Sequence, residues 1–296
     1  MLYAIILYMK KHITTTWIAA LLAALALLTG CGLRDAAQSD PHQNQVEVYD
    51  GANTVWVTLW KDVAPSDWTQ DEFRLNDDGS VDYTGTRYCV QQGIDVSQWQ
   101  GEIDWNAVAA SGVEFAYIRA GYRGYSDGEI HTDERFEQNV TAARAAGLEI
   151  GVYFFSQAVS PEEAAEEARW LLEHADGYDP ALPYAFDWEA QITYDDDEVR
   201  TDGMLGAEMT ACAVAFCDEI RSAGKTPAVY ANRWQGYYDY DLSQLDGAEL
   251  WISAPGDWDD FYYAHAIWQY SYAGAVPGIS SGVDRDLRFL PITEER

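Results

Sequence analysis

From Gly93 onward, short apolar runs alternate with amphipathic stretches, and this alternation constrains the fold more than any other feature of the chain. The runs have strand length and are rich in β-branched and aromatic residues, whereas the stretches between them have helical periodicity. Strands are expected at 94–97, 115–120, 150–155, 183–189, 227–231, 249–253 and 266–270, with a short last one at Asp284, and helices at 103–110, 133–146, 160–175 and 204–223. This order predicts a parallel sheet with right-handed crossovers.

The sheet is expected to close on itself. About eight strands are predicted, and the chain carries no glycine-rich phosphate loop of the kind that marks a doubly wound sheet. The predicted fold class is therefore α/β, a TIM-like β/α barrel over residues 92–296, with a short β appendage before it.

The amino terminus is typical of a secretory signal. Lys10 and Lys11 precede an apolar run at 18–28, which is short for a membrane span. The run closes as Leu28-Thr29-Gly30-Cys31, which resembles the bacterial lipobox and implies cleavage before Cys31 with lipid on its sulfur. Residues 1–31 are thus predicted to be a signal peptide, and the mature chain a lipoprotein anchored outside the cytoplasmic membrane. An uncleaved membrane anchor is the alternative.

Two segments separate this signal from the barrel. Residues 32–45 are polar, show no periodicity and are expected to form a flexible tether. Residues 46–91 contain short alternating runs at 55–60 and 80–83, separated by Asp77-Asp78-Gly79, and predict a small β-rich segment. Spacing or packing is its expected role, with binding as the alternative.

The net formal charge of −31 excludes nucleic acid as a partner and adsorption to anionic lipid by charge. Contact with a membrane is therefore expected through the lipid anchor only, and the protein is expected to be a monomer. Cys89, Cys212 and Cys217 are interpreted as small buried residues without disulfide or metal spacing. The acidic run 195–198 lacks the alternation and glycine of a calcium loop, so no metal or cofactor is predicted.

Carboxylates gather at the predicted strand ends, where barrels of this kind carry their chemistry. Asp187 and Glu189 lie two residues apart on one strand and therefore on one face. Mutual repulsion and burial should raise the pKa of at least one of them, as a proton donor in a glycosidase requires. Asp95 and Asp284 end neighbouring strands; their alternative is a structural role as acids bonded to backbone donors. For the pair itself, the alternative is two solvated acids.

Other strand-end residues are candidates for substrate binding. Arg119 is expected to pair with the acids of this groove or to contact the substrate. Aromatic rings can stack on sugar faces, although each can equally fill the core. The aromatic candidates are Tyr153, Phe155, Trp188, Tyr230 and Trp268.

Several spaced motifs in one order resemble the family 25 glycoside hydrolases, which are N-acetylmuramidases (lysozymes). The matching segments are Gly93-Ile94-Asp95-Val96-Ser97-Gln98-Trp99-Gln100-Gly101, Ile103-Asp104-Trp105, Phe115 to Gly121, Gly151 to Ser156, Phe186-Asp187-Trp188-Glu189, Trp268-Gln269-Tyr270, Val276 to Ile279 and Val283-Asp284. The resemblance covers residues 92 to 290. It implies a flattened β/α barrel that hydrolyses the β-1,4 bond between N-acetylmuramic acid and N-acetylglucosamine in peptidoglycan glycan strands.

By the same resemblance, Glu189 matches the general acid, Asp187 its partner carboxylate, and Asp95 and Asp284 two further acids. The chain departs from the family at Asp284-Arg285-Asp286, where Asp-x-Asn is usual, and at Phe154, where His or Tyr is common. Two acids on one strand face are too close to flank a sugar from opposite sides. The hypothesis is therefore a substrate-assisted route with net retention, in which the 2-acetamido oxygen is the nucleophile.

Two rival functions stay open at this point. One is an endo-N-acetylglucosaminidase or chitinase-like enzyme, although the longer run of alternating acids expected before its catalytic Glu is absent from Tyr184-Ala185-Phe186. The other is a non-catalytic, lipid-anchored glycan-binding protein. The reducing end of a released fragment would separate the enzymes, and turnover would separate an enzyme from a binding protein.

Overall fold

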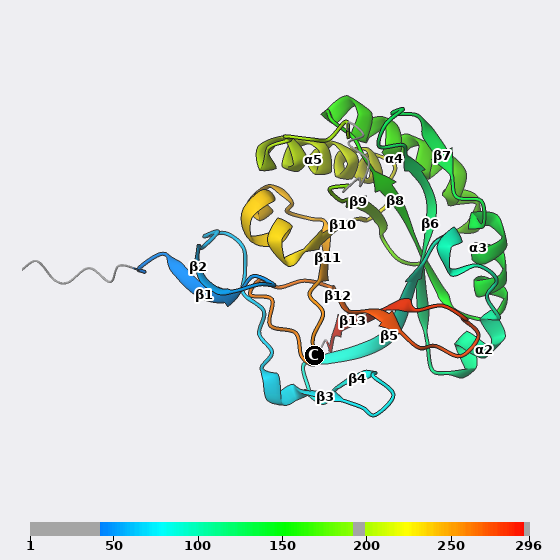
Figure 1. Cartoon of the computed structure of the whole chain (residues 1–296), viewed down its shortest axis with the longest axis horizontal. Coiled ribbons are helices and arrows are strands. Elements are labelled where there is room, and N and C mark those ends of the chain that lie inside the picture. The colour runs from blue at the N-terminus through cyan, green and yellow to red at the C-terminus, as the bar shows by residue number, and fades with distance from the viewer. Residues whose placement is uncertain (1–41, 192–198, 293–296) are drawn as a thin grey trace, which may run out of the picture. The chain divides into compact units, whose positions relative to one another are not determined.

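Eight strands form a closed barrel in the computed structural model, which describes residues 42–191 and 199–292 (Figure 1). The predicted signal peptide, Cys31 and the acidic run 195–198 lie outside the described residues. The strand order is β5-β13-β12-β11-β10-β9-β8-β6, and pairing of β5 with β6 closes the ring. The barrel strands are β5 (Tyr88–Val96), β6 (Phe115–Arg123), β8 (Glu149–Ser156), β9 (Tyr184–Trp188), β10 (Pro227–Asn232), β11 (Glu249–Ser253), β12 (Ile267–Gly274) and β13 (Val283–Pro291). The predicted fold class is confirmed.

Among the described residues, four α-helices follow individual strands and lie outside the barrel: α2 (Trp105–Ala110), α3 (Phe136–Ala145), α4 (Pro161–Ala175) and α5 (Gly206–Ser222). The start of α4 has the predicted cap, because the Ser160 hydroxyl accepts a hydrogen bond from the Glu163 N–H and Pro161 occupies the first turn. The stops after α3 and α5 are Gly147 and Gly224, with φ of 92° and 75°.

The last strand corrects the sequence prediction. β13 is nine residues long rather than short, and it runs antiparallel to both β12 and β5. The sheet therefore contains both parallel and antiparallel pairs. A further short strand, β7 (Ile130–Thr132), pairs antiparallel with the end of β6. Because β13 runs backwards, Asp284 reaches the barrel mouth at the start of its strand and pairs in register with Asp95.

Strand alternation divides the apolar residues into two layers. Inward residues such as Tyr117, Tyr153 and Trp251 fill the barrel, while outward ones pack against the helices. The interior is tight where glycine faces a ring: a Cβ on Gly93 would lie 2.1 Å from the Phe115 ring, and one on Gly151 would lie 2.5 Å from that of Tyr117. Larger residues at these two positions would force the rings to move.

Of the predicted segment 46–91, the part before Tyr88 covers the side of the barrel that has no helix among the described residues, whereas residues 88–91 belong to the barrel strand β5. This segment forms two hairpins, β1 (Gln45–Tyr49) with β2 (Thr54–Thr58) and β3 (Phe73–Leu75) with β4 (Val81–Tyr83). Trp68 stacks on Phe289 of β13 with ring centroids 4.4 Å apart, and Phe73 meets Trp268 of β12 edge-on at 5.5 Å. Because no helix follows β11 or β12 to bury their outer faces, the segment supplies the layer that the sheet needs there (Figure 1).

The cysteine interpretation holds for two of the three residues. Cys212 and Cys217 are buried in α5, but Cys89 is exposed, which corrects its assignment to the core. It sits near the start of β5, at a position where its side chain faces solvent rather than either apolar layer.

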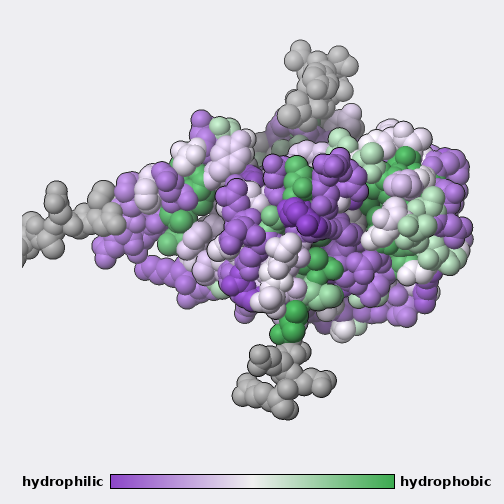
Figure 2. Space-filling model, turned by 90° about the horizontal axis from the view of Figure 1, so that it is seen from below, coloured by the Kyte–Doolittle hydropathy of each residue, from purple (hydrophilic) through white to green (hydrophobic). Residues whose placement is uncertain are grey.

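The visible surface in Figure 2 is mostly hydrophilic, with hydrophobic residues in scattered patches, in keeping with the acidic composition. Within residues 42–191 and 199–292, none of the helices combines the length and apolarity needed to cross a membrane.

Candidate active site

A groove of about 680 Å³ opens at the barrel mouth, where the parallel strands end. This volume lies in the range of small-ligand sites. All four predicted catalytic acids, Asp95, Asp187, Glu189 and Asp284, line it. The structure therefore brings together residues that are up to 189 positions apart in sequence.

Each acid reaches the groove through the strand that carries it. Asp187 is the fourth residue of β9 and Glu189 follows its end, so the two share the inward face. Asp95 on β5 lies opposite Asp284 on β13 in the antiparallel ladder. The four carboxyls thus come from three strands, and β5 and β13 are direct neighbours.

Burial and mutual repulsion raise the pKa values of these acids. Desolvation, followed by the charge of Asp284, raises the pKa of Glu189 to about 7. Desolvation likewise raises the pKa of Asp284 to about 6. The pKa values of Asp187 and Asp95 are also raised, first by burial and then by neighbouring carboxylates. The groove therefore retains protons near neutrality, which a general acid requires.

Arg119 sits beside the acidic pair, and its charge lowers the pKa of Asp187 against the effect of burial. Its Nε donates to Asp133 Oδ2 at 2.8 Å, and its guanidinium lies 5.2 Å from the centroid of the Tyr122 ring. Arg119 also lines the groove. The position of Arg119 fits the predicted partner of groove acids, and its ion pair with Asp133 holds the guanidinium in place.

One oxygen of the acidic pair lacks a hydrogen-bond partner among the residues that the structure describes. Asp187 Oδ1 is buried and accepts no hydrogen bond from the described residues. A buried carboxyl oxygen without a donor is costly, so a polar group of a bound molecule would find a ready acceptor there.

The structure separates the predicted substrate-binding residues into two groups. Tyr153, Phe155 and Tyr230 line the groove together with Arg119. Trp188 and Trp268 do not: both are buried in the outer core, where their indole N–H groups donate to the carbonyls of Ala158 and Ala254. These two predictions are wrong because each tryptophan neighbours an inward residue on its strand and so faces the opposite side.

The prediction missed groove residues that the motifs already contained. Gln269, between Trp268 and Tyr270, faces inward, where its Nε2 donates to Asp95 Oδ2 at 2.7 Å and its Oε1 accepts from the Tyr230 hydroxyl at 2.9 Å. Trp99, within the first motif, lines the groove and is 75% exposed. Strand parity would have identified Gln269, whereas the exposure of Trp99 depends on the loop that follows β5.

The backbone of the acidic pair is clamped by buried side chains. Gln157 Nε2 donates to the Glu189 carbonyl at 2.7 Å, and Gln235 Nε2 donates to the Trp188 carbonyl at 2.6 Å. Both glutamines are buried. They hold the chain on which both acids are mounted, a support that sequence patterns did not reveal.

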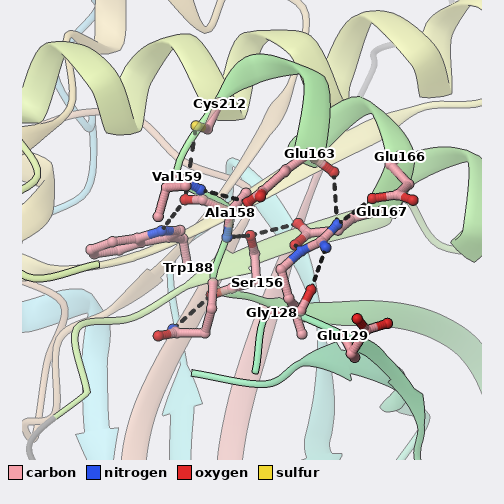
Figure 3. Close-up of polar contacts among 12 residues, drawn as sticks. Gly128, Glu129, Ser156, Ala158, Val159, Glu163, Glu166, Glu167, Trp188 and Cys212 are labelled. Carbon is pink, nitrogen blue, oxygen red and sulfur yellow. Dashed lines mark hydrogen bonds and ion pairs between the residues drawn. The ribbon is translucent and has the colours of Figure 1, made fainter. Parts of the chain in front are cut away.

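A network of charged and polar side chains connects Ser156, at the end of β8, with Glu167 of α4 (Figure 3). The Ser156 hydroxyl donates to Glu167 Oε2 at 2.6 Å, and Arg123 Nε donates to Glu167 Oε1 at 2.6 Å. Burial raises the pKa of Glu167 to about 7, with Ser156 and Arg123 acting in the opposite direction. The network ties α4 to the ends of β6 and β8, next to the groove.

Paired, desolvated carboxyls at the mouth of a β/α barrel are the arrangement of a glycosidase. Within the described residues, no group of three or more His, Cys, Asp or Glu is placed to hold a metal ion. The model of the glycosyl hydrolases family 25 matches residues 94–279, and the chain belongs to this family.

Named relatives accord with this assignment. Lysozyme M1 of Streptomyces globisporus is 28% identical over 66% of this chain and 66% of its own length. The autolytic lysozyme of Clostridium acetobutylicum is 29% identical over 66% of this chain and 55% of its own. The structure of the bacterial lysozyme of Streptomyces coelicolor, 27% identical, superposes with a TM-score of 0.53 and covers 66% of this chain and 90% of that one. The chain thus spans somewhat under two thirds of the two curated relatives.

Proposed function

We propose that this protein is a peptidoglycan hydrolase, an N-acetylmuramidase that cleaves the β-1,4 bond between N-acetylmuramic acid and N-acetylglucosamine. The observation that carries the proposal is the carboxyl pair Asp187 and Glu189 at the mouth of a family 25 barrel, with the pKa of Glu189 raised to about 7. An acid with that pKa holds a proton over much of the neutral range and can release it during reaction.

In the proposed mechanism, Glu189 protonates the oxygen of the leaving sugar. Glu189 is the more open of the two acids, while the positive charge of Arg119 favours the ionised form of Asp187. The free Asp187 Oδ1 would accept the N–H of the substrate's 2-acetamido group. The acetamido oxygen then attacks the anomeric carbon, and the C–O bond to the leaving sugar breaks. Ionised Glu189 finally takes a proton from the water that opens the oxazolinium ion.

Asp95 and Asp284 support this chemistry from the neighbouring strands. The charge of Asp284 helps Glu189 to keep its proton, since it raises the pKa of that acid. Asp95 is bonded to Gln269 and would fix sugar hydroxyls through its remaining lone pairs. Tyr153, Phe155 and Tyr230 are proposed to contact sugar rings along the groove wall.

Clearing of a peptidoglycan suspension tests the proposal directly. Purified protein should clear the suspension, and Glu189→Gln should lose at least about 100-fold in rate, because removal of a general acid typically costs 10²- to 10⁴-fold. Unchanged thermal unfolding of the variant would serve as the folding control. Binding of glycan without turnover by the wild type would favour the non-catalytic alternative.

Two product analyses refine the assignment. Mass spectrometry should find muramic acid at the new reducing ends; glucosamine ends would instead establish the glucosaminidase alternative. Proton NMR of the first product should show the retained anomer, since two inversions at one carbon restore its configuration. An inverted first product would exclude the substrate-assisted route.

We also propose that the chain acts outside the cytoplasmic membrane, held by lipid on Cys31, as a monomer. The lipobox-like residues 28–31 support this part of the proposal. A palmitate analogue should label the wild type and not Cys31→Ala. Label that persists in the variant would exclude attachment at this sulfur.

A further inference from the structure

The groove occupies only one side of the barrel mouth. In the ring of strands, β9 with Asp187 and Glu189 separates an arc of β5, β6 and β8 from an arc of β10, β11 and β12. Beyond the strand ends, the groove is walled chiefly from the first arc, by the loop after β5 and the turn between β6 and β7. The groove residues from the second arc, Tyr230, Trp251 and Gln269, all lie within its strands. The strand ends of the second arc therefore form a separate part of the mouth.

Exposed aromatic rings gather at this separate part. Trp234 follows β10, and Tyr238 lies four residues later in the helical turn η4 (Gln235–Asp239), so that the two rings are neighbours with centroids 4.4 Å apart. Two more rings come from β12 and from β1. The four residues, each between 43% and 56% exposed, are named the β10–β12 rim: Trp234, Tyr238, Tyr272 and Tyr49.

The rim begins directly beside the chain segment that carries the acidic pair. Strand β10 pairs in register with β9 up to Asp187. Gln235 Nε2 then donates to the Trp188 carbonyl at 2.6 Å, one residue before Glu189. Because Trp234 directly precedes Gln235, its backbone is fixed next to the segment that bears both acids.

Tyr272 brings the rim close to the same acids from β12. The Ser253 hydroxyl, at the carboxyl end of β11, donates to the Tyr272 hydroxyl at 2.8 Å. Burial raises the pKa of the Tyr272 hydroxyl, and the charges of Glu189 and Asp284 act in the same direction. The hydroxyl end of this residue is thus within electrostatic reach of the acids, while the residue as a whole remains exposed.

The β1–β2 hairpin adds the fourth ring and lies beside the turn that follows β10 (Figure 1). The guanidinium of Arg233 lies 5.4 Å from the centroid of the Tyr49 ring, and its Nη1 and Nη2 donate to the carbonyls of Tyr49 and Ala254 at 3.5 and 3.4 Å. The Tyr238 hydroxyl donates to Asp50 Oδ2 at 3.2 Å. The hairpin is therefore attached at the ends of β10 and β11, although the family model begins only at residue 94.

We propose that the β10–β12 rim binds amino-sugar units of the peptidoglycan strand on the side of the acidic pair that faces away from the groove. Hydrolysis within a polymer requires sugars on both sides of the bond that breaks, and the groove accounts for one side. Exposed rings offer flat apolar faces on which sugars can stack, and a cluster of them marks a binding surface. The inference rests on the proposed function for the identity of the polymer.

Sedimentation with insoluble peptidoglycan measures the rim in a chain that cannot cleave it. In the Glu189→Gln background, Trp234→Ala with Tyr272→Ala should raise Kd about 20-fold, since the loss of each ring costs about fivefold. Ile292→Ala is the control, because this exposed residue follows β13 at the barrel end opposite the mouth; it should change Kd less than about twofold. A Kd of the rim variant within twofold of the parent would overturn the proposal.

Soluble glycan strands, freed of stem peptides by an amidase and titrated by calorimetry, separate a glycan surface from a peptide surface. The loss should persist on these bare strands, and a loss confined to material with stem peptides would refute the proposal. Trp234→Phe should bind within about twofold of the parent, whereas a loss equal to that of Trp234→Ala would exclude stacking. If the double variant does not fold, the single variants still decide, at about fivefold each. If the wild type binds peptidoglycan without cleaving it, the proposed function fails while the binding comparison stands.

Discussion

Replacement of Arg123 with methionine would leave a buried carboxyl without its cation. Arg123 Nε lies 2.6 Å from Glu167 Oε1, and the two side chains are only 5% and 0% exposed. The second carboxylate on Arg123, that of Glu166, is 58% exposed, and exposed ion pairs contribute about 0–1 kcal/mol. The cost should therefore fall mainly on Glu167, whose remaining donor among the described residues is the hydroxyl of Ser156.

The loss of folding stability in Arg123→Met depends on pH in a defined direction. Removal of one partner from a buried pair destabilises proteins by about 3–5 kcal/mol. In the wild type, burial raises the pKa of Glu167 from 4.5 to about 7, so the contribution of this group is fully present below pH 4.5 and is lost as the pH rises to about 7. Without Arg123 the folded pKa rises further, and the loss continues above pH 7. The deficit of Arg123→Met should be smallest near pH 5 and largest near pH 8.

Urea unfolding followed by circular dichroism at these two pH values measures the deficit. Arg169→Met is a matched control, because Arg169 pairs with Glu219 at the surface, where the two side chains are 56% and 35% exposed; its cost should stay below about 1 kcal/mol at both pH values. Arg123→Met combined with Glu167→Gln should recover part of the loss at pH 8. A deficit that is equal at both pH values, or equal to that of the control, would refute the electrostatic reasoning.

Three further predictions concern the groove. Trp99→Ala should raise KM about fivefold on soluble glycan fragments with unchanged thermal stability, because a loss of stacking is worth roughly 1 kcal/mol; an unchanged KM would exclude Trp99 from the binding surface. Gln157→Leu should lower kcat about tenfold with KM within twofold, since the Glu189 carbonyl loses its donor, and steady-state kinetics would contradict this if KM alone changed. Asp284→Asn should move the alkaline limb of the kcat/KM profile down by roughly one pH unit, because the charge of Asp284 raises the pKa of Glu189; a limb that stays in place would show that burial alone sets that pKa.

Local patterns predicted most of the barrel because its strands and helices are locally consistent. The capping residues Ser160 and Pro161 marked the start of α4, and the alternation at Asp187 and Glu189 placed both acids on one face. The same alternation excludes Trp188 and Trp268 from the groove, since a residue between two inward positions on a strand must point outward. The error there came from selecting rings by type rather than by strand parity.

The rest of the structure depends on contacts between distant segments, which leave little trace in a local pattern. The antiparallel direction of β13 is set by its pairing with β5 and β12. The residues of β13 alone did not indicate this direction. The covering role of residues 46–87 likewise exists only because β11 and β12 are followed by no helix among the described residues. The clamp of Gln157 on Glu189 joins residues 32 positions apart.

The fold and the acidity of the site have one physical origin. Inward aromatic rings such as Tyr117 and Trp251 make the barrel interior dry, and the strand ends above them carry the acids. This apolar interior disfavours the charged form of each of these acids. Arg119, which also forms an ion pair with Asp133, offsets the effect at Asp187 by lowering its pKa. Protons must therefore stay within the cluster near neutrality. In the proposed mechanism, the proton that leaves for the substrate is the one on Glu189, the more open acid of the pair.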